Sequence, residues 1–185
     1  MSRYLIVYGT KEGQTAKISD RIGGIIRDRG HDVDVYDAAL VPSSFDMNDY
    51  KAAFIGSSIH MMQWSRPAIE FAHSYKSQLE KIPSAFFAVS MSAVSPRSPD
   101  GVPPSDNPFI HSFFDKSGWH PNVVGNFGGA LMYTKYGYFT RWLMVLINGW
   151  RLGARDTSHD IEFTDWKQVS KFAEDFVDEA EKAHQ

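Results

Sequence analysis

Cysteine is absent from this chain of 185 residues. Disulfides, thiolate zinc sites, cysteine-ligated iron–sulfur clusters and a cysteine nucleophile are therefore all excluded. Neither sign of charge is in large excess, because the formal net charge is -3, and no cluster of Lys and Arg stands out. A basic patch is the electrostatic feature that nucleic-acid binding requires, so we expect no nucleic-acid partner.

Long apolar runs are missing as well, and we expect no leader segment. No run approaches the roughly 18 to 20 apolar residues of a membrane span. The first strand-like run begins at Tyr4 with no signal peptide before it, so we expect a cytoplasmic protein. The seven histidines show no metal-ligand spacing such as His-Glu-x-x-His, and we expect no metal.

Strand-like and helix-like runs alternate along the chain. The strand-like runs cover residues 4–8, 32–36, 52–56, 84–89 and 123–131. The helix-like runs cover about residues 15–30, 65–79, 109–114, 137–149 and 165–182. Residues 94–108 are rich in Ser, Pro, Asp and Gly, which indicates a loop insertion.

This alternation predicts an α/β fold in a single domain over residues 1–185. Most of the strand-like runs lack a clean polar alternation, which is typical of strands buried on both faces. Such strands form a parallel sheet with helices on both sides. We therefore expect a doubly wound sheet of five parallel strands.

The motif Thr10–Thr15, which reads Thr-Lys-Glu-Gly-Gln-Thr, joins the first strand-like run to a helix-like run. The first N–H groups of a helix have no internal partner, and the helix dipole adds partial positive charge there. A phosphate can bind such a terminus without a basic side chain. Gly13 would let the backbone approach the ligand, and the hydroxyls of Thr10 and Thr15 would add donors. An ordinary β–α turn capped by a threonine is the alternative.

Other phosphate motifs do not fit this region. The chain contains no Gly-x-x-x-x-Gly-Lys-Ser/Thr string, and no Gly-x-Gly-x-x-Gly follows the first strand-like run. Glu12 is unusual in an anion site, because its carboxylate would repel a phosphate. We expect this carboxylate to point away from the phosphate.

Two further loops follow buried strand-like runs, and ligands of open α/β sheets lie beyond such strand ends. Together with the phosphate loop, these two loops suit a ligand with a phosphate and a flat ring. Small residues would contact the edge of the ring, and an apolar side chain would cover its face. The predicted phosphate residues are Thr10, Lys11, Glu12, Gly13, Gln14 and Thr15. The predicted ring residues, in loops Ser57–Trp64 and Ser90–Val94, are Ser57, Ser58, Ile59, His60, Met61, Trp64, Ser90, Met91, Ser92, Ala93 and Val94.

At these positions the chain resembles the flavodoxin-like family. Thr10, Gly13 and Thr15 match that family's motif Thr-x-Thr-Gly-x-Thr, with Glu12 in place of the second threonine. The resemblance is closer to one branch, the flavodoxin-like protoporphyrinogen oxidases, also called menaquinone-dependent protoporphyrinogen IX dehydrogenases. That branch begins with Ser/Thr-Thr-x-Asp-Gly-Gln-Thr and has an acidic residue where Glu12 stands. Further similar segments are Phe54–Ile59, Pro83–Phe86, Gly129–Tyr133 and Phe163–Trp166.

The resemblance implies FMN as cofactor and oxidation of protoporphyrinogen IX to protoporphyrin IX in heme biosynthesis. It also implies a membrane quinone as electron acceptor. His60 could then donate a hydrogen bond to reduced flavin or carry protons; a solvent-exposed loop histidine is the alternative. The flavin carries the redox chemistry, so no catalytic side chain is assigned. A flavodoxin-like electron carrier and an NAD(P)H:quinone reductase are the other candidate functions.

Substrate contacts are expected from the loop at 94–108 and from the apolar stretch 136–147. Arg97, Lys135 and Arg141 are the candidates to face the carboxylates of a tetrapyrrole, because arginine pairs with carboxylates through two parallel hydrogen bonds. Burial of the stretch 136–147 against the sheet is one interpretation. Its basic and aromatic flanks also fit a peripheral contact with the cytoplasmic face of the inner membrane. The sequence gives no indication of the number of subunits.

Overall fold

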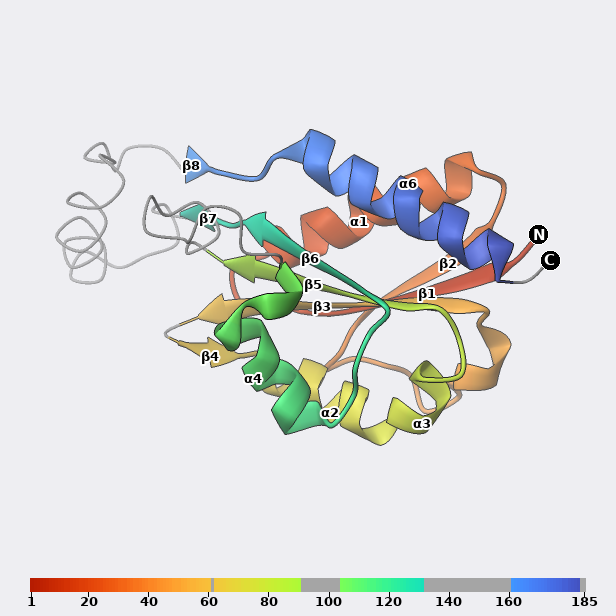
Figure 1. Ribbon diagram of the computed structural model, residues 1–185, viewed down its shortest axis with the longest axis horizontal. Coiled ribbons are helices and arrows are strands. Elements are labelled where there is room, and N and C mark those ends of the chain that lie inside the picture. The colour runs from red at the N-terminus through yellow and green to blue at the C-terminus, as the bar shows by residue number, and fades with distance from the viewer. Residues whose placement is uncertain (61, 91–103, 132–160, 184–185) are drawn as a thin grey trace, which may run out of the picture.

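The computed structural model describes residues 1–60, 62–90, 104–131 and 161–183 (Figure 1). Its centre is a sheet with the strand order β2-β1-β3-β5-β6, in which every neighbouring pair is parallel. The strands are β1 (Arg3–Gly9), β2 (Asp32–Asp37), β3 (Ala52–His60), β5 (Ser84–Ser90) and β6 (Val123–Gly128). The predicted doubly wound sheet of five parallel strands is confirmed.

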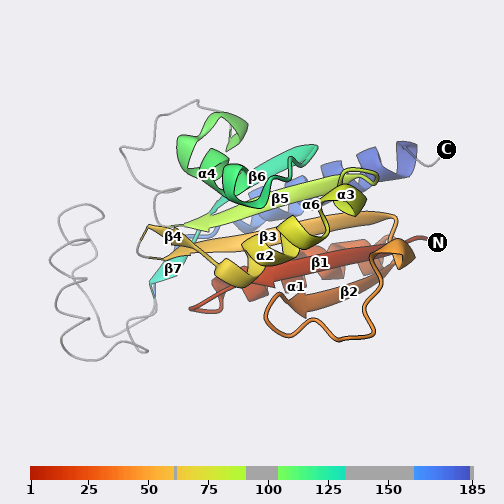
Figure 2. The same cartoon turned by 90° about the horizontal axis from the view of Figure 1, so that it is seen from below.

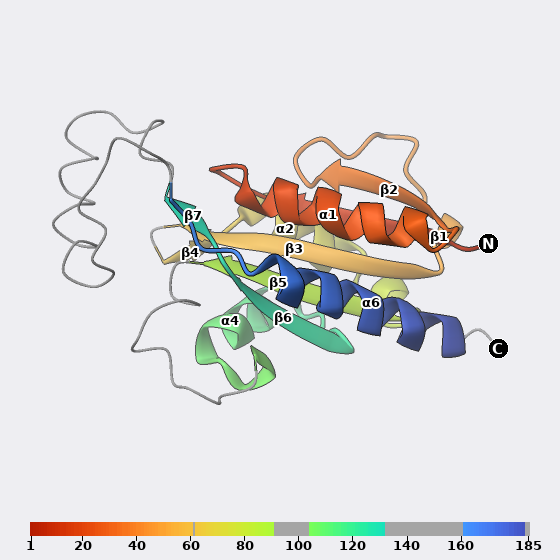
Figure 3. The same ribbon diagram turned by 90° about the horizontal axis from the view of Figure 1, so that it is seen from above.

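Helices cover both faces of this sheet. The helices α1 (Gln14–Asp28) and α6 (Trp166–Lys182) lie on one face (Figures 1 and 3). The other face carries α2 (Arg66–Ser74), α3 (Lys76–Leu79) and α4 (Pro108–Ser117), which Figure 2 shows from below. Single 3₁₀ turns form η1 (Met47–Asp49) and η3 (Pro104–Asp106).

Two hydrophobic cores fill the spaces between the sheet and its helices. Successive side chains of a strand point to opposite faces. Tyr4 and Ile6 of β1 therefore join the core under α1 and α6, and Leu5 and Val7 join the core under α2 and α4. Both sets are buried. This double burial explains why β1 reads as an unbroken apolar run.

The structure corrects three predicted boundaries. The strand-like run 52–56 continues to His60, and a short antiparallel strand β4 (Gln63–Trp64) pairs with its end. The predicted strand 123–131 is divided into β6 and β7 (Ala130–Leu131), and β7 pairs with β8 (Ile161–Glu162). The helix-like run 65–79 is divided at Tyr75 into α2 and α3.

The extension of β3 has a long-range cause. Serine favours turns, so Ser57 and Ser58 read as a loop. In the fold Ser57 pairs with Gly9 of β1 and Ala88 of β5 and is fully buried. Backbone pairing with two neighbours therefore outweighs the local turn preference. The predicted helix 137–149 and most of the loop insertion lie outside the described residues.

Two glycines allow a matched test of the packing around the sheet. A methyl group at Gly56 would lie 2.2 Å from Cζ of the buried Phe87, whereas one at Gly24 in α1 would meet nothing within 4 Å. We expect Gly56→Ala to lower the free energy of unfolding by about 1–3 kcal/mol through overpacking. Gly24→Ala should raise it by about 0.5–1 kcal/mol. Urea denaturation measures both, and equal destabilisation by the two changes would contradict this packing.

Candidate functional site

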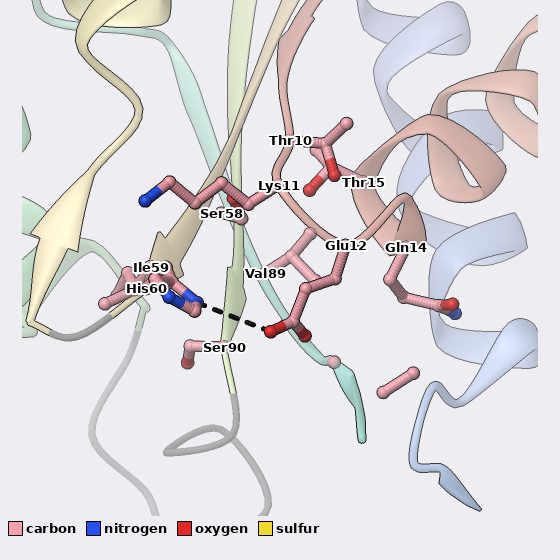
Figure 4. Close-up of a pocket in the computed structure, with 12 residues that line it drawn as sticks. Thr10, Lys11, Glu12, Gln14, Thr15, Ser58, Ile59, His60, Val89 and Ser90 are labelled. Carbon is pink, nitrogen blue, oxygen red and sulfur yellow. Dashed lines mark ion pairs between the residues drawn. The ribbon is translucent and has the colours of Figure 1, made fainter. Parts of the chain in front are cut away.

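A pocket opens where β1, β3 and β5 end (Figure 4). The chain passes from β1 outward to β2 and then back to β3 on the other side of β1, so the topological switch point lies between β1 and β3. Ligands of open α/β sheets bind at that point. The pocket is lined by Thr10, Lys11, Glu12, Gln14, Thr15, Ser58, Ile59, His60, Val89, Ser90, Gly129 and Ala130.

Gly13 shapes the loop between β1 and α1. Its φ of 95° lies in the left-handed region that favours glycine. Its N–H donates to Thr10 Oγ1 at 2.9 Å, and its carbonyl accepts the N–H of Lys17 at 3.2 Å to start α1. The N–H groups of the first helical turn, at residues 14–16, have no acceptor within the helix. The loop therefore presents a row of backbone donors at a helix N-terminus.

The hydroxyl of Thr15 has a property that an ordinary capped turn does not explain. Thr15 is fully buried, and its Oγ1 has no hydrogen-bond partner in the described part of the chain. A buried polar group without a partner costs about 1–3 kcal/mol. Because Thr15 also lines the pocket, its hydroxyl fits a ligand oxygen such as that of a phosphate.

Gln14 ties the start of α1 to the end of β6. Its Nε2 donates to Thr164 Oγ1 at 2.8 Å, and the Thr164 hydroxyl donates to the carbonyl of Gly128 at 2.7 Å. The Oε1 of Gln14 is buried without a partner among the residues described. The loop Thr10–Thr15 is thus held from the side of β6. Oε1 of Gln14 stays available for a ligand.

Glu12 and His60 face each other across the pocket. Glu12 Oε1 lies 3.4 Å from His60 Nδ1, and the two side chains are 26% and 27% exposed. Figure 4 shows the Glu12 carboxylate directed toward His60, on the side away from Thr10 and Thr15. His60 belongs to the end of β3 and is only partly exposed, so the alternative of an exposed loop histidine is wrong.

Two predicted ring residues do not line this pocket. Ser57 is buried inside β3, where its Oγ accepts the N–H of Ser65 at 3.2 Å. Trp64 is buried, and its indole N–H donates to Ser112 Oγ at 2.9 Å and to the carbonyl of Phe109 at 3.2 Å. These contacts hold the Trp64 indole against α4.

Several predicted residues lie outside the described part of the chain, and their roles stay predictions. They are Met61, Met91, Ser92, Ala93, Val94, Arg97, Lys135 and Arg141.

Sequence reasoning missed some lining residues. Val89, Gly129 and Ala130 line the pocket although only their neighbours were predicted. The rule that ligands lie beyond strand ends applies equally to the end of β6 and could have found Gly129 and Ala130. A second cavity shares Thr10, Lys11, Ser58 and His60 with the first and adds Asp37, Ala39, Gln63, Trp64, Ser65, Arg66 and Pro67.

Within residues 1–60, 62–90, 104–131 and 161–183, no three His, Asp or Glu side chains come together as a metal site would need. In the same ranges no helix is long and apolar enough to span a bilayer.

Comparison with known sequences gives a family and named relatives. The flavodoxin domain matches residues 5–158. A protoporphyrinogen IX dehydrogenase (quinone) of Leishmania major is 34% identical over 177 residues, which are 94% of this chain and 74% of that protein. The protein of the same name from Escherichia coli (strain K12) is 29% identical over 173 residues, which are 94% of this chain and 93% of the relative.

Comparison with solved structures concerns the fold alone. A short-chain flavodoxin associated with a non-canonical PDU bacterial microcompartment has a TM-score of 0.58 at 12% identity, covering 97% of this chain and 99% of that one. Oxidised flavodoxin 1 from Bacillus cereus has a TM-score of 0.52 at 14% identity, covering 96% and 98%.

The Thr15 hydroxyl can be tested by its effect on stability without ligand. Thr15→Val keeps the branched shape and removes the unpartnered hydroxyl, so we expect the free energy of unfolding of the ligand-free protein to rise by about 1 kcal/mol. Ser19→Ala in the same helix is the control, because the buried Ser19 hydroxyl donates to the carbonyl of Thr15 at 2.9 Å. Its loss should lower stability by about 1 kcal/mol. Urea denaturation distinguishes the two, and a loss of stability in Thr15→Val would argue against a hydroxyl reserved for a ligand.

Proposed function

Because this chain belongs to the flavodoxin domain family, we propose that it is an FMN-dependent oxidoreductase that oxidises protoporphyrinogen IX to protoporphyrin IX and passes the electrons to a quinone. The relatives named protoporphyrinogen IX dehydrogenase (quinone) match 94% of this chain, which supports the substrate and the acceptor. The structural observation that carries the proposal is the buried, unpartnered Thr15 hydroxyl at the N-terminus of α1. The reaction is a step of heme biosynthesis.

A flavin mononucleotide suits the residues of the pocket. The first-turn N–H groups of α1 and the hydroxyls of Thr10 and Thr15 would hold one phosphate. Ile59 of β3 and Val89 of β5 offer apolar surface in the same pocket, and Ser58 and Ser90 offer polar edges. FMN is proposed rather than FAD because the sequence contains one phosphate loop. Bound here, the flavin supplies the redox chemistry, while these residues bind and orient it.

The substrate and membrane contacts are proposed from the sequence. Arg97, Lys135 and Arg141 would face the carboxylates of the tetrapyrrole, and Arg97 and Arg141 rank first because their guanidinium groups can bind a carboxylate with two hydrogen bonds. A lipid-soluble quinone requires an encounter with a membrane. We therefore propose a cytoplasmic protein that visits the cytoplasmic face of the inner membrane through the stretch 136–147.

FMN binding should depend on Gly13 far more than on Lys11. A valine at position 13 would have to adopt a φ of 95°, which costs a residue with a Cβ roughly 1–2 kcal/mol. We expect Gly13→Val to raise the FMN dissociation constant roughly tenfold. Lys11→Ala should change it less than about twofold, because the backbone supplies the donors.

Quenching of flavin fluorescence on titration measures both dissociation constants, with circular dichroism as the check of folding. Equal losses of affinity in the two variants would contradict a backbone-based phosphate site. Protein that neither carries a yellow cofactor nor quenches FMN fluorescence would remove the flavin from the proposal.

The activity itself is tested by fluorescence. FMN-loaded protein is mixed anaerobically with protoporphyrinogen IX and a quinone, and the appearance of porphyrin fluorescence is followed. We expect a rate well above the spontaneous one that requires both the quinone and FMN. FMN-loaded protein without quinone-dependent fluorescence would leave the electron carrier as the better interpretation.

A further inference from the structure

The pair of Glu12 and His60 is the one carboxylate–imidazole contact described within the flavin pocket. Its two members come from different elements, Glu12 from the loop after β1 and His60 from the last residue of β3. His60 is held there because it pairs with Gln63 of β4 in an antiparallel ladder. The pair therefore joins the phosphate loop to the sheet edge at a defined position, with 3.4 Å between Oε1 and Nδ1.

The contact determines how the imidazole can act. A carboxylate near Nδ1 favours the tautomer with hydrogen on Nδ1, which leaves Nε2 as a proton acceptor. Imidazole is the side chain whose charge ordinarily changes between about pH 5 and 8. Nε2 of His60 is thus a proton acceptor held at a defined place in the pocket.

We propose that the Glu12–His60 pair accepts the second proton of each dehydrogenation and returns it to the acceptor. This inference rests on the proposed function. Each dehydrogenation takes two electrons and two protons from the substrate. Both electrons and one proton go to the flavin ring, and the remaining proton goes to Nε2 of His60. On reoxidation the quinone receives both electrons together with the ring proton and the His60 proton, so that a quinol leaves and both groups return to their starting state.

Charge explains why the second proton would stay in the pocket. A flavin that has taken up two electrons and one proton carries added negative charge. That charge would lie near the carboxylate of Glu12. Protonation of His60 offsets that charge, and Glu12 acts as the positioning residue. The charged side chains that share the walls of the two cavities with His60 are Lys11, Glu12, Asp37 and Arg66. Arg66 is 86% exposed and pairs with Glu70 at 2.7 Å, so its charge is largely compensated by a partner outside the pocket.

The test is the pH dependence of the flavin midpoint potential in FMN-loaded protein, measured by anaerobic potentiometric titration between about pH 5 and 9. The slope gives the number of protons taken up per electron pair. In the wild type we expect a pH range with two protons per electron pair. In His60→Gln we expect one proton fewer to be taken up per electron pair over that range. His111→Gln, at an exposed position on α4, is the matched control and should behave as the wild type does.

The same titration of Glu12→Gln provides a second test, because this variant keeps the imidazole and removes only the carboxylate. Without the carboxylate the imidazole loses its partner at Nδ1, and we expect fewer protons to be taken up per electron pair than in the wild type. Identical slopes at every pH in the wild type and His60→Gln would assign the second proton to another group and overturn the inference. A wild-type slope in Glu12→Gln would remove the positioning role of Glu12 and overturn the proposed pair. Both results leave the proposed function in place. A wild-type protein that binds no FMN would instead overturn the proposed function, and this inference with it.

Discussion

The first N–H groups of α1, which have no acceptor inside the helix, are the constraint on which the site depends. They cannot be satisfied inside the helix, and they lie at the end of β1, where the strand order reverses. The loop that leads to them is stabilised by the hydrogen bond from Gly13 N–H to Thr10 Oγ1 and by the left-handed φ of Gly13. The buried Thr15 hydroxyl points to the same requirement, since it lacks a partner among the described residues. An anion with several oxygens can accept hydrogen bonds from all of these groups at once.

The sheet positions the other walls of the pocket. Five parallel strands bring their carboxyl ends to one edge, so residues distant in sequence, such as Ser58 and Ser90, line one cavity. Helices on both faces bury the strands and leave this edge as the place where polar groups can gather. The contacts from Gln14 through Thr164 to Gly128 hold the phosphate loop against the last strand of the sheet. Rigid elements thus support a site made from loop and strand ends.

Electrostatics in the pocket is mixed rather than basic. Lys11, Glu12 and His60 all line it, and the carboxylate turns to the imidazole instead of to the phosphate loop. A phosphate held by backbone groups does not need a basic side chain, so the side chains of the loop are left for other tasks. This separation of roles makes a carboxylate tolerable beside an anion site. It also gives the pocket a titratable group close to where a flavin ring would lie.

Local pattern was sufficient for much of this protein. Apolar strand-like runs such as 4–8 and helix-like runs such as 15–30 predicted the alternating strands and helices, because burial leaves a direct trace in the residue pattern. The motif Thr10–Thr15 predicted a phosphate loop, because its geometry depends on residues adjacent in sequence.

Long-range pairing decided what local pattern could not. Ser57 reads as a turn but is buried between Gly9 and Ala88. Trp64 lines the second cavity and not the first, and its indole N–H donates to Ser112 of α4. The meeting of Glu12 with His60 depends on the order of β1 and β3 in the sheet and on the β3–β4 pairing. The sequence by itself therefore determined the fold class and placed the loop Thr10–Thr15 at the start of a helix, since both arise from neighbouring residues. Only the tertiary structure decided which side chains share the pocket, because that depends on which strand ends lie side by side.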